Sequence, residues 1–234
     1  MGRLATPDGR EILFTSKAIP QRDKRQTVYV LDSSDGSMRE LFPRLDSIGH
    51  IHVSPDGRNM VFVKGGVVSR SGQLVVSNLG DPEGLVLATG DHPDGPLSGW
   101  FGQPLFSPDG SQVAFCRQEQ ADRDLLASSL WVVPADGSGE PRVLARAPLI
   151  ERIIWHPNGR FIAFLRRDPE NQAGRSLSVV SLETGEIHGV LDRSDWEGGI
   201  RLNDWSPDGR WIGFSDGQGT WEYWMANDPL GGKH

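Results

Sequence analysis

Two segments of this chain place a tryptophan beside carboxylates, a combination that suits ligand binding. They contain Asp91, Asp94 and Trp100 in the first segment, and Asp195, Trp196 and Glu197 in the second. An indole ring can stack on a sugar or attract a cation, and carboxylates accept hydrogen bonds from either kind of ligand. The pattern predicts a surface that binds a glycan or a cationic peptide. The alternative is that each tryptophan covers the hydrophobic core beneath a loop while the acids face water.

Polar residues of a second group interrupt apolar segments that lead into proline-containing turns. They are His50, His52, Gln103 and Arg152. His50 and His52 are two residues apart, which would place both on one strand face. Gln103 and Arg152 precede their turns by the same distance as His50, so a repeated structure would bring the three around an axis. Such a ring could bind an anion; the alternative is the lining of a wet channel.

Motifs for metal binding and catalysis are weak or absent. Two histidines without a third ligand are poor evidence for a metal site, so no metal or other cofactor is predicted. The sequence contains no Gly-x-Ser-x-Gly, His-Glu-x-x-His, Gly-x-Gly-x-x-Gly or Gly-x-x-x-x-Gly-Lys-Ser/Thr pattern. Cys116 is the one cysteine, which excludes an intrachain disulfide and a thiolate cluster. We therefore do not expect an enzyme.

A repeat indicates the elements that would position these residues. Pro-Asp-Gly, or Pro-Asn-Gly in the fourth copy, is followed by Phe five residues after its glycine, at intervals of 48, 53, 49 and 50 residues. The copies begin at Pro7, Pro55, Pro108, Pro157 and Pro207. Proline presets φ and glycine takes a positive φ, which makes a tight turn between antiparallel strands. An aliphatic residue stands two positions before each Phe, so both side chains share one strand face.

Repeats of about 40 to 50 residues are typical of β-propellers, in which each repeat forms one four-stranded blade. Further strand-like runs, such as Thr27–Leu31 and Ser129–Val133, follow each turn and complete the four strands. We expect an all-β protein, a β-propeller of four-stranded antiparallel blades with five repeats. It would form one domain over residues 1–234, with blades at about 1–46, 47–94, 95–147, 148–196 and 197–234.

The order of strands separates short turns from long loops. Turns between the first and second strands, and between the third and fourth, would emerge on one rim. The longer links would emerge on the other rim, which we call the long-loop rim. Binding groups concentrate on loops held by a rigid scaffold. The long-loop rim, with both tryptophan segments, is therefore the predicted site for a protein or glycan partner.

Composition excludes several classes of partner. The net charge is −7 and the pI about 5.4, which disfavours a general nucleic-acid or anionic-membrane surface, although Lys17, Arg22, Lys24 and Arg25 cluster around Asp23. No apolar run approaches the roughly 18 residues of a membrane span, so no membrane insertion is expected. The chain does not open with the charged segment and apolar segment of a secretion signal. We also expect the protein to be a monomer.

The repeat core Ser-Pro-Asp-Gly-Arg-x-Ile-x-Phe, with an aromatic residue before the serine in several copies, resembles the repeat of TolB-type β-propellers. Related repeats occur in the propeller domains of the prolyl oligopeptidase and dipeptidyl peptidase families. The resemblance covers the whole chain, but only turn and packing positions match, so no catalytic residue is carried over. It implies a non-catalytic binding or scaffolding module, located in the periplasm or outside the cell.

The resemblance also leaves alternatives open. Propellers of this type are usually six-bladed, so the chain could instead be a fragment of a six-bladed propeller that lacks a blade upstream. One alternative function is the substrate-gating propeller of a prolyl oligopeptidase-type serine peptidase. Another is an oligosaccharide lyase in which His50 or His52 acts as the base.

Overall fold

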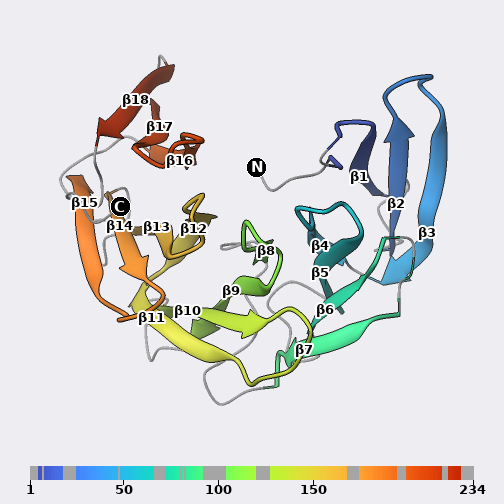
Figure 1. The fold of residues 1–234 in the computed structure, drawn as a ribbon, viewed down its shortest axis with the longest axis horizontal. Helices are drawn as coiled ribbons and strands as arrows, with labels where there is room; N and C mark the ends of the chain where they lie inside the picture. The colour runs from blue at the N-terminus through green and yellow to red at the C-terminus, as the bar shows by residue number, and fades with distance from the viewer. Residues whose placement is uncertain are drawn as a thin grey trace.

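The computed structural model describes residues 5–6, 8–17, 25–46, 48–65, 72–79, 81, 83–91, 104–119, 127–167, 174–193, 199–217 and 221–227. Within these ranges the chain forms five antiparallel sheets in chain order, which we call blades 1 to 5. The sheets follow one another around a common centre (Figure 1). The predicted all-β propeller architecture is confirmed. The described part contains no helix with the length and apolarity of a membrane span.

Blades 2, 3 and 4 are four-stranded, as predicted, with each strand paired to the next along the chain. Blade 2 contains β4 (Ile48–Val53), β5 (Asn59–Lys64), β6 (Gln73–Asn78) and β7 (Leu85–Thr89). Blade 3 contains β8 (Leu105–Phe106), β9 (Gln112–Glu119), β10 (Ala127–Pro134) and β11 (Arg142–Pro148). Blade 4 contains β12 (Ile150–Trp155), β13 (Phe161–Arg167), β14 (Arg175–Ser181) and β15 (Ile187–Arg193).

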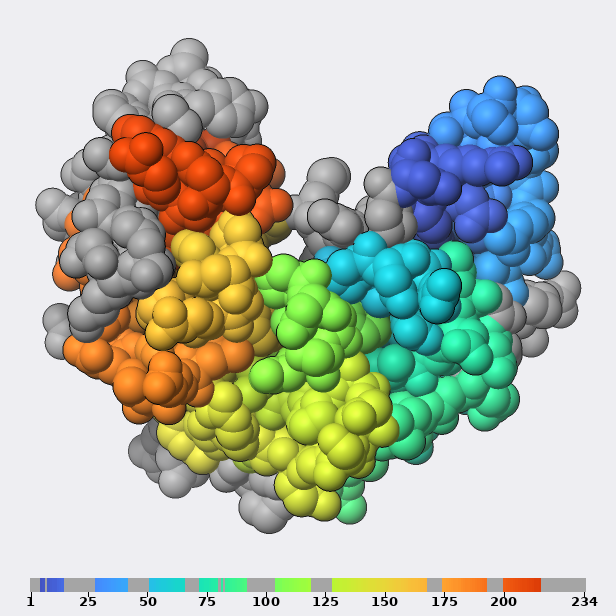
Figure 2. Space-filling model, viewed as in Figure 1, coloured from blue at the N-terminus to red at the C-terminus, as the bar shows by residue number. Residues whose placement is uncertain are grey.

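The first and last blades each have three strands in the described ranges. Blade 1 contains β1 (Glu11–Lys17), β2 (Arg25–Asp32) and β3 (Met38–Asp46). An isolated bridge between Ala5 and Ile12 stands where the other blades have an inner strand. Blade 5 contains β16 (Gly199–Trp205), β17 (Trp211–Gly217) and β18 (Trp221–Asn227). In the space-filling view, the coloured atoms of these two blades do not meet (Figure 2).

The Pro-Asp-Gly turns have the predicted conformation, since φ of the third-turn glycine, Gly110, is +76°. In this turn the Ser107 hydroxyl donates to Asp109 Oδ1 at 2.5 Å and accepts the N–H of Gln112 at 3.0 Å. In the fourth turn a histidine replaces the serine, and His156 Nδ1 accepts the N–H of Asn158 at 3.1 Å. Each turn therefore joins the inner strand to the second strand of its blade.

Alternate residues of each second strand pack against opposite neighbours. In β5, Met60 and Phe62 pack with the blade 1 residues Leu13 and Val28, whereas Val61 packs with blade 3. Four hydrophobic clusters built in this way join blades 1 and 2, 2 and 3, 3 and 4, and 4 and 5. The predicted common face of the aliphatic residue and the Phe is therefore the face that packs on the preceding blade.

Candidate functional site

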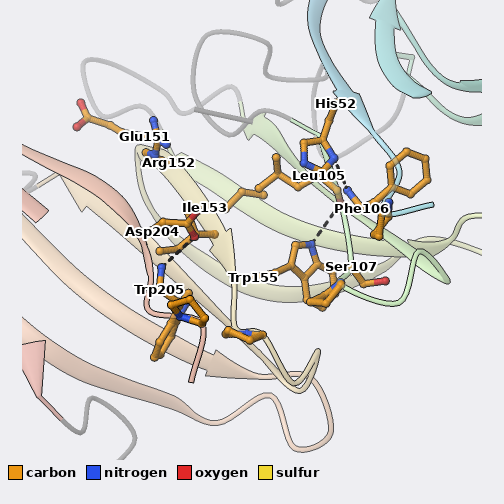
Figure 3. Close-up of a pocket in the computed structure, with 15 residues that line it drawn as sticks. His52, Leu105, Phe106, Ser107, Glu151, Arg152, Ile153, Trp155, Asp204 and Trp205 are labelled. Carbon is orange, nitrogen blue, oxygen red and sulfur yellow. Dashed lines mark hydrogen bonds between the residues drawn. The ribbon is translucent and has the colours of Figure 1, made fainter. Parts of the chain in front are cut away.

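A cavity of about 430 Å³ lies along the inner strands of blades 2 to 5. Its walls come from β4, β8, β12 and β16, and Figure 3 shows the polar side chains and tryptophans that line it. Four turn prolines also contribute to the lining, namely Pro55, Pro108, Pro157 and Pro207. Glu151, near the start of β12, lines it as well. The cavity thus extends along the inner strands from the turns toward the long-loop ends.

Irregular pairing changes how these inner strands present their side chains. The register shifts between Gly49 and His52 in β4, between Ile150 and Arg152 in β12, and between Leu202 and Asp204 in β16. A β-bulge adds one residue and redirects the side chains around it. The regular two-residue alternation is therefore interrupted between Gly49 and His52.

His52 is almost fully buried, with an exposed fraction of 9%, and joins two blades. Its Nδ1 accepts the backbone N–H of Phe106, on the neighbouring β8, at 3.1 Å. From the other side, Trp155 Nε1 donates to the carbonyl oxygen of Leu105 at 3.2 Å. The two-residue strand β8 is thus held by side chains of both neighbouring blades (Figure 3).

Arg152 and Asp204 bring opposite charges to the cavity. Burial lowers the pKa of Arg152 below its usual value, and the Asp204 carboxylate acts in the opposite direction. Arg152 Nη2 donates to the carbonyl oxygen of Asn203 at 3.3 Å, and Asp204 Oδ1 accepts the N–H of Trp205 at 2.9 Å. Arg152 Nε is buried and has no acceptor among the described residues. Because a buried donor without an acceptor is costly, this position suits a ligand oxygen.

Glu151 is held by two arginines on the neighbouring strands. Its Oε1 accepts from Arg167 Nη2 at 2.5 Å and from Nε at 3.0 Å, and its Oε2 accepts from Arg175 Nε at 2.5 Å. The side chains of Glu151 and Arg175 are 14% and 13% exposed. Both carboxylate oxygens of Glu151 therefore tie the ends of β12, β13 and β14 together, which makes this residue a poor general base.

Of the predicted site residues, the described structure brings together His52 and Arg152. Asp91 is exposed. The backbone of His50 lies in β4, but its side chain is outside the described set. Asp94, Trp100, Gln103, Asp195, Trp196 and Glu197 lie outside the described residues. Their binding roles stay predictions.

The structure also adds residues that the sequence prediction did not include. Asp204 stands three residues before its turn proline, the same repeat position as His52, and this correspondence could have identified it. Trp155 and Leu105 line the cavity but carry no polar pattern in the sequence. The described side chains include no group of three or more His, Cys, Asp or Glu residues arranged to hold a metal ion.

Several known proteins resemble this chain in sequence or in fold. No family model matches the chain. The Tol-Pal system protein TolB of Gluconobacter oxydans (strain 621H) is 31% identical over 114 residues, which are 49% of this chain and 22% of that protein. The crystal structure of TolB from Acinetobacter baumannii has a TM-score of 0.69 and 17% identity, covering 98% of this chain and 52% of that one.

An enzyme shares the same fold. Oligogalacturonate lyase in complex with manganese has a TM-score of 0.74 and 15% identity, covering 97% of this chain and 64% of that one. The chain thus spans about half the length of the Acinetobacter protein and a smaller part of the Gluconobacter one. At these identities the structural likeness carries the fold and not the activity. The repeats, the blades and these likenesses together show that the chain has a TolB-like β-propeller fold.

Proposed function

We propose that this protein is a non-catalytic binding module that holds a protein or glycan partner at its long-loop rim and in the adjoining cavity. The observation that carries the proposal is the cavity on the inner strands, where Arg152 Nε is buried and no described residue accepts a hydrogen bond from it. A carboxylate, a peptide carbonyl or a sugar oxygen would satisfy that donor. Trp100 and Trp196, which the sequence predicts on the long-loop rim, would supply stacking surface for the same partner.

Residue chemistry supports binding over catalysis. His52 Nδ1 already accepts Phe106 N–H, and both oxygens of Glu151 are bound to arginines. Either group would have to break a contact between strands before it could accept a proton from a substrate through these atoms. A general base needs an acceptor atom within hydrogen-bond reach of the proton that it removes, and these atoms are bound to other groups.

The test uses two probes, a displayed library of linear peptides and an oligogalacturonate fragment as an acidic glycan. Replacing Arg152 by Gln should weaken binding of a probe by about 10- to 150-fold, because a hydrogen bond to a charged group contributes about 1.5 to 3 kcal/mol. Arg58→Gln is the matched control, since Arg58 is exposed on a turn of blade 2. Trp100→Ala and Trp196→Ala should also weaken binding without a large change in melting temperature. Equal affinities of the Arg152 and Arg58 variants would place the partner elsewhere.

The lyase alternative has its own outcome in the same experiment. Incubation with oligogalacturonate should yield no unsaturated uronate, detected by ultraviolet absorbance. Product formed by the wild-type protein and lost in His52→Asn would replace the binding proposal with the lyase. The peptidase-gating alternative requires a hydrolase domain, and sequencing the DNA on both sides of the reading frame tests for one.

A further inference from the structure

Two buried histidines hold neighbouring blades together on the turn side of the molecule. His52, in blade 2, accepts the N–H of Phe106, in blade 3. His156 follows β12 in blade 4, and its Nε2 lies 3.2 Å from the carbonyl oxygen of Gly209 in the turn of blade 5. The first contact lies at the cavity wall, and the second lies beside Pro157 and Trp205, which line the same cavity.

Both contacts require a neutral imidazole. A nitrogen that accepts an N–H must present a lone pair, so Nδ1 of His52 and of His156 carries no proton. For His156 the proton then resides on Nε2, where it is donated to Gly209 O, while Nδ1 accepts the N–H of Asn158 at 3.1 Å. Protonation would place a second N–H against the backbone N–H of Phe106 or of Asn158. Two donors in that arrangement repel each other.

Packing leaves each ring little freedom to escape this conflict. His156 is 4% exposed, and its ring meets Trp205 edge-on at 4.5 Å and Phe161 at 5.8 Å between ring centres. His52 is 9% exposed and lies 6.1 Å from the ring of Phe106. Rotation toward water would therefore separate the blades that the rings join.

Charged groups lie on the elements around both histidines, and the carboxylates among them accept hydrogen bonds from other groups. Around His156, Asp208 and Arg210 flank Gly209, Asp204 precedes Trp205, and the Arg160 guanidinium lies over the Phe161 ring at 5.9 Å. Asp208 is bound to Ser206, and Asp204 to the N–H of Trp205.

Around His52, the cavity adds Glu151, Arg152 and Asp204, while Asp56 and Asp109 lie in the adjoining turns. Both turn carboxylates accept from the serine of their own turn, and Glu151 is held by arginines. The carboxylates of these surrounding elements therefore already accept hydrogen bonds from other groups.

We propose that His52 and His156 make the propeller acid-sensitive: the hydrogen bonds that join blade 2 to blade 3 and blade 4 to blade 5 need neutral imidazoles, so proton uptake favours states in which these contacts are open and the cavity wall is loosened. The loss of stability begins at about pH 6.5, the ordinary imidazole pKa at which an open or unfolded chain takes up these protons, and grows as the pH falls. It is a property of the protein alone and does not depend on the proposed partner.

The first test compares urea unfolding at pH 7.5 and pH 5. A histidine that must stay neutral in the folded state lowers the folding equilibrium constant about 30-fold at pH 5, because the unfolded chain takes up the proton. His52→Asn keeps an acceptor near the Nδ1 position. His156→Ser with Asn158→Asp restores the turn chemistry of Ser107 and Asp109. In the wild-type protein the two histidines together should lower the folding equilibrium constant about 1,000-fold between pH 7.5 and pH 5. The combined variant should not show this loss.

Two further measurements keep the test decisive. His188→Asn is the control, since His188 is partly exposed on β15, and this variant should retain the full pH dependence. Should the combined variant fail to fold, amide hydrogen exchange of Phe106 in the wild-type protein replaces it. A fall of about 30-fold or more in the protection of this amide between pH 7.5 and pH 5, after correction for the intrinsic rate, supports the proposal. Equal protection at both pH values, or a combined variant with wild-type pH dependence, overturns it.

Discussion

At the scale of single residues, the serine before the Pro-Asp-Gly turn connects the turn to the next strand. Ser107 donates to Asp109 and accepts the N–H of Gln112, so one hydroxyl satisfies two polar groups. This hydroxyl, followed by the N–H of Ser111, lowers the pKa of Asp109, and burial acts in the opposite direction. The lowered pKa means that the ionised carboxylate stabilises the fold above about pH 4, and that this contribution is lost as the pH falls through the folded-state pKa.

Ser107→Ala should therefore lower the free energy of unfolding by about 1 to 3 kcal/mol at pH 7, because it removes two hydrogen bonds that each contribute about 0.5 to 1.5 kcal/mol. The pKa of Asp109 should rise toward its usual value in a titration followed by NMR. Ser111→Ala is the control, because it removes a hydroxyl that also contacts Asp109 but leaves the Gln112 N–H bound. Equal losses in the two variants would contradict the role assigned to Ser107.

The chemistry of Cys116 is governed by burial. The residue is 1% exposed in the cluster between blades 3 and 4, and burial raises the pKa of its thiol well above the usual value. Because the thiolate is the reactive form, the native protein should not react with a thiol-specific reagent at pH 8. Reaction should begin only at denaturant concentrations that unfold the chain. Rapid labelling of the native protein would show that blades 3 and 4 separate readily.

At the scale of elements, the second strands carry most of the contact between blades. Met60 and Ile12 occupy the same repeat position, but Met60 is fully buried against blade 1 whereas Ile12 is 37% exposed. The difference arises because no described blade packs on the outer face of blade 1. Ile12 and Met38, the latter 64% exposed, therefore lie on a face that no described blade covers.

Met60→Ala should lower the free energy of unfolding by about 2 to 5 kcal/mol, the usual loss for a buried aliphatic side chain. Ile12→Ala should lower it by less than about 1 kcal/mol, since much of that side chain is already in water. Urea unfolding of both variants measures the two values. A loss for Ile12→Ala as large as that for Met60→Ala would indicate that another segment covers blade 1 in solution.

At the scale of the whole molecule, the blades form a series in which the described hydrophobic clusters link nearest neighbours. Blades 2, 3 and 4 each share a cluster with two neighbours, while blades 1 and 5 share one each. Structures built this way have a stability close to the sum of unit and interface terms. The terminal blades should therefore open most easily.

Amide hydrogen exchange should show this gradient. Protection should be highest in β9, β10, β13 and β14, and lower in β1, β2, β17 and β18, because the terminal strands lack one interface. Mass spectrometry of peptic fragments resolves these strands. Uniform protection across all five blades would show that the ring is closed in solution by a contact outside the described residues.

Much of the architecture could be predicted from the sequence because its causes are local. Proline and glycine impose the turn, and a period of two places Met60 and Phe62 on one face and Val61 on the other. These effects act within about ten residues, so each repeat reveals them independently. The terminal blades have three strands each in the described ranges.

Only the tertiary structure decided which polar residues share a site. His52, Arg152 and Asp204 are 50 or more residues apart in the chain and meet because three inner strands converge around one cavity. The register shifts beside these residues break the alternation from which a strand face is predicted. Hydrogen bonds such as His52 to Phe106 and Trp155 to Leu105 likewise depend on the spacing of separate blades. Local sequence patterns determine the blade, whereas the packing of one blade on another determines the cavity.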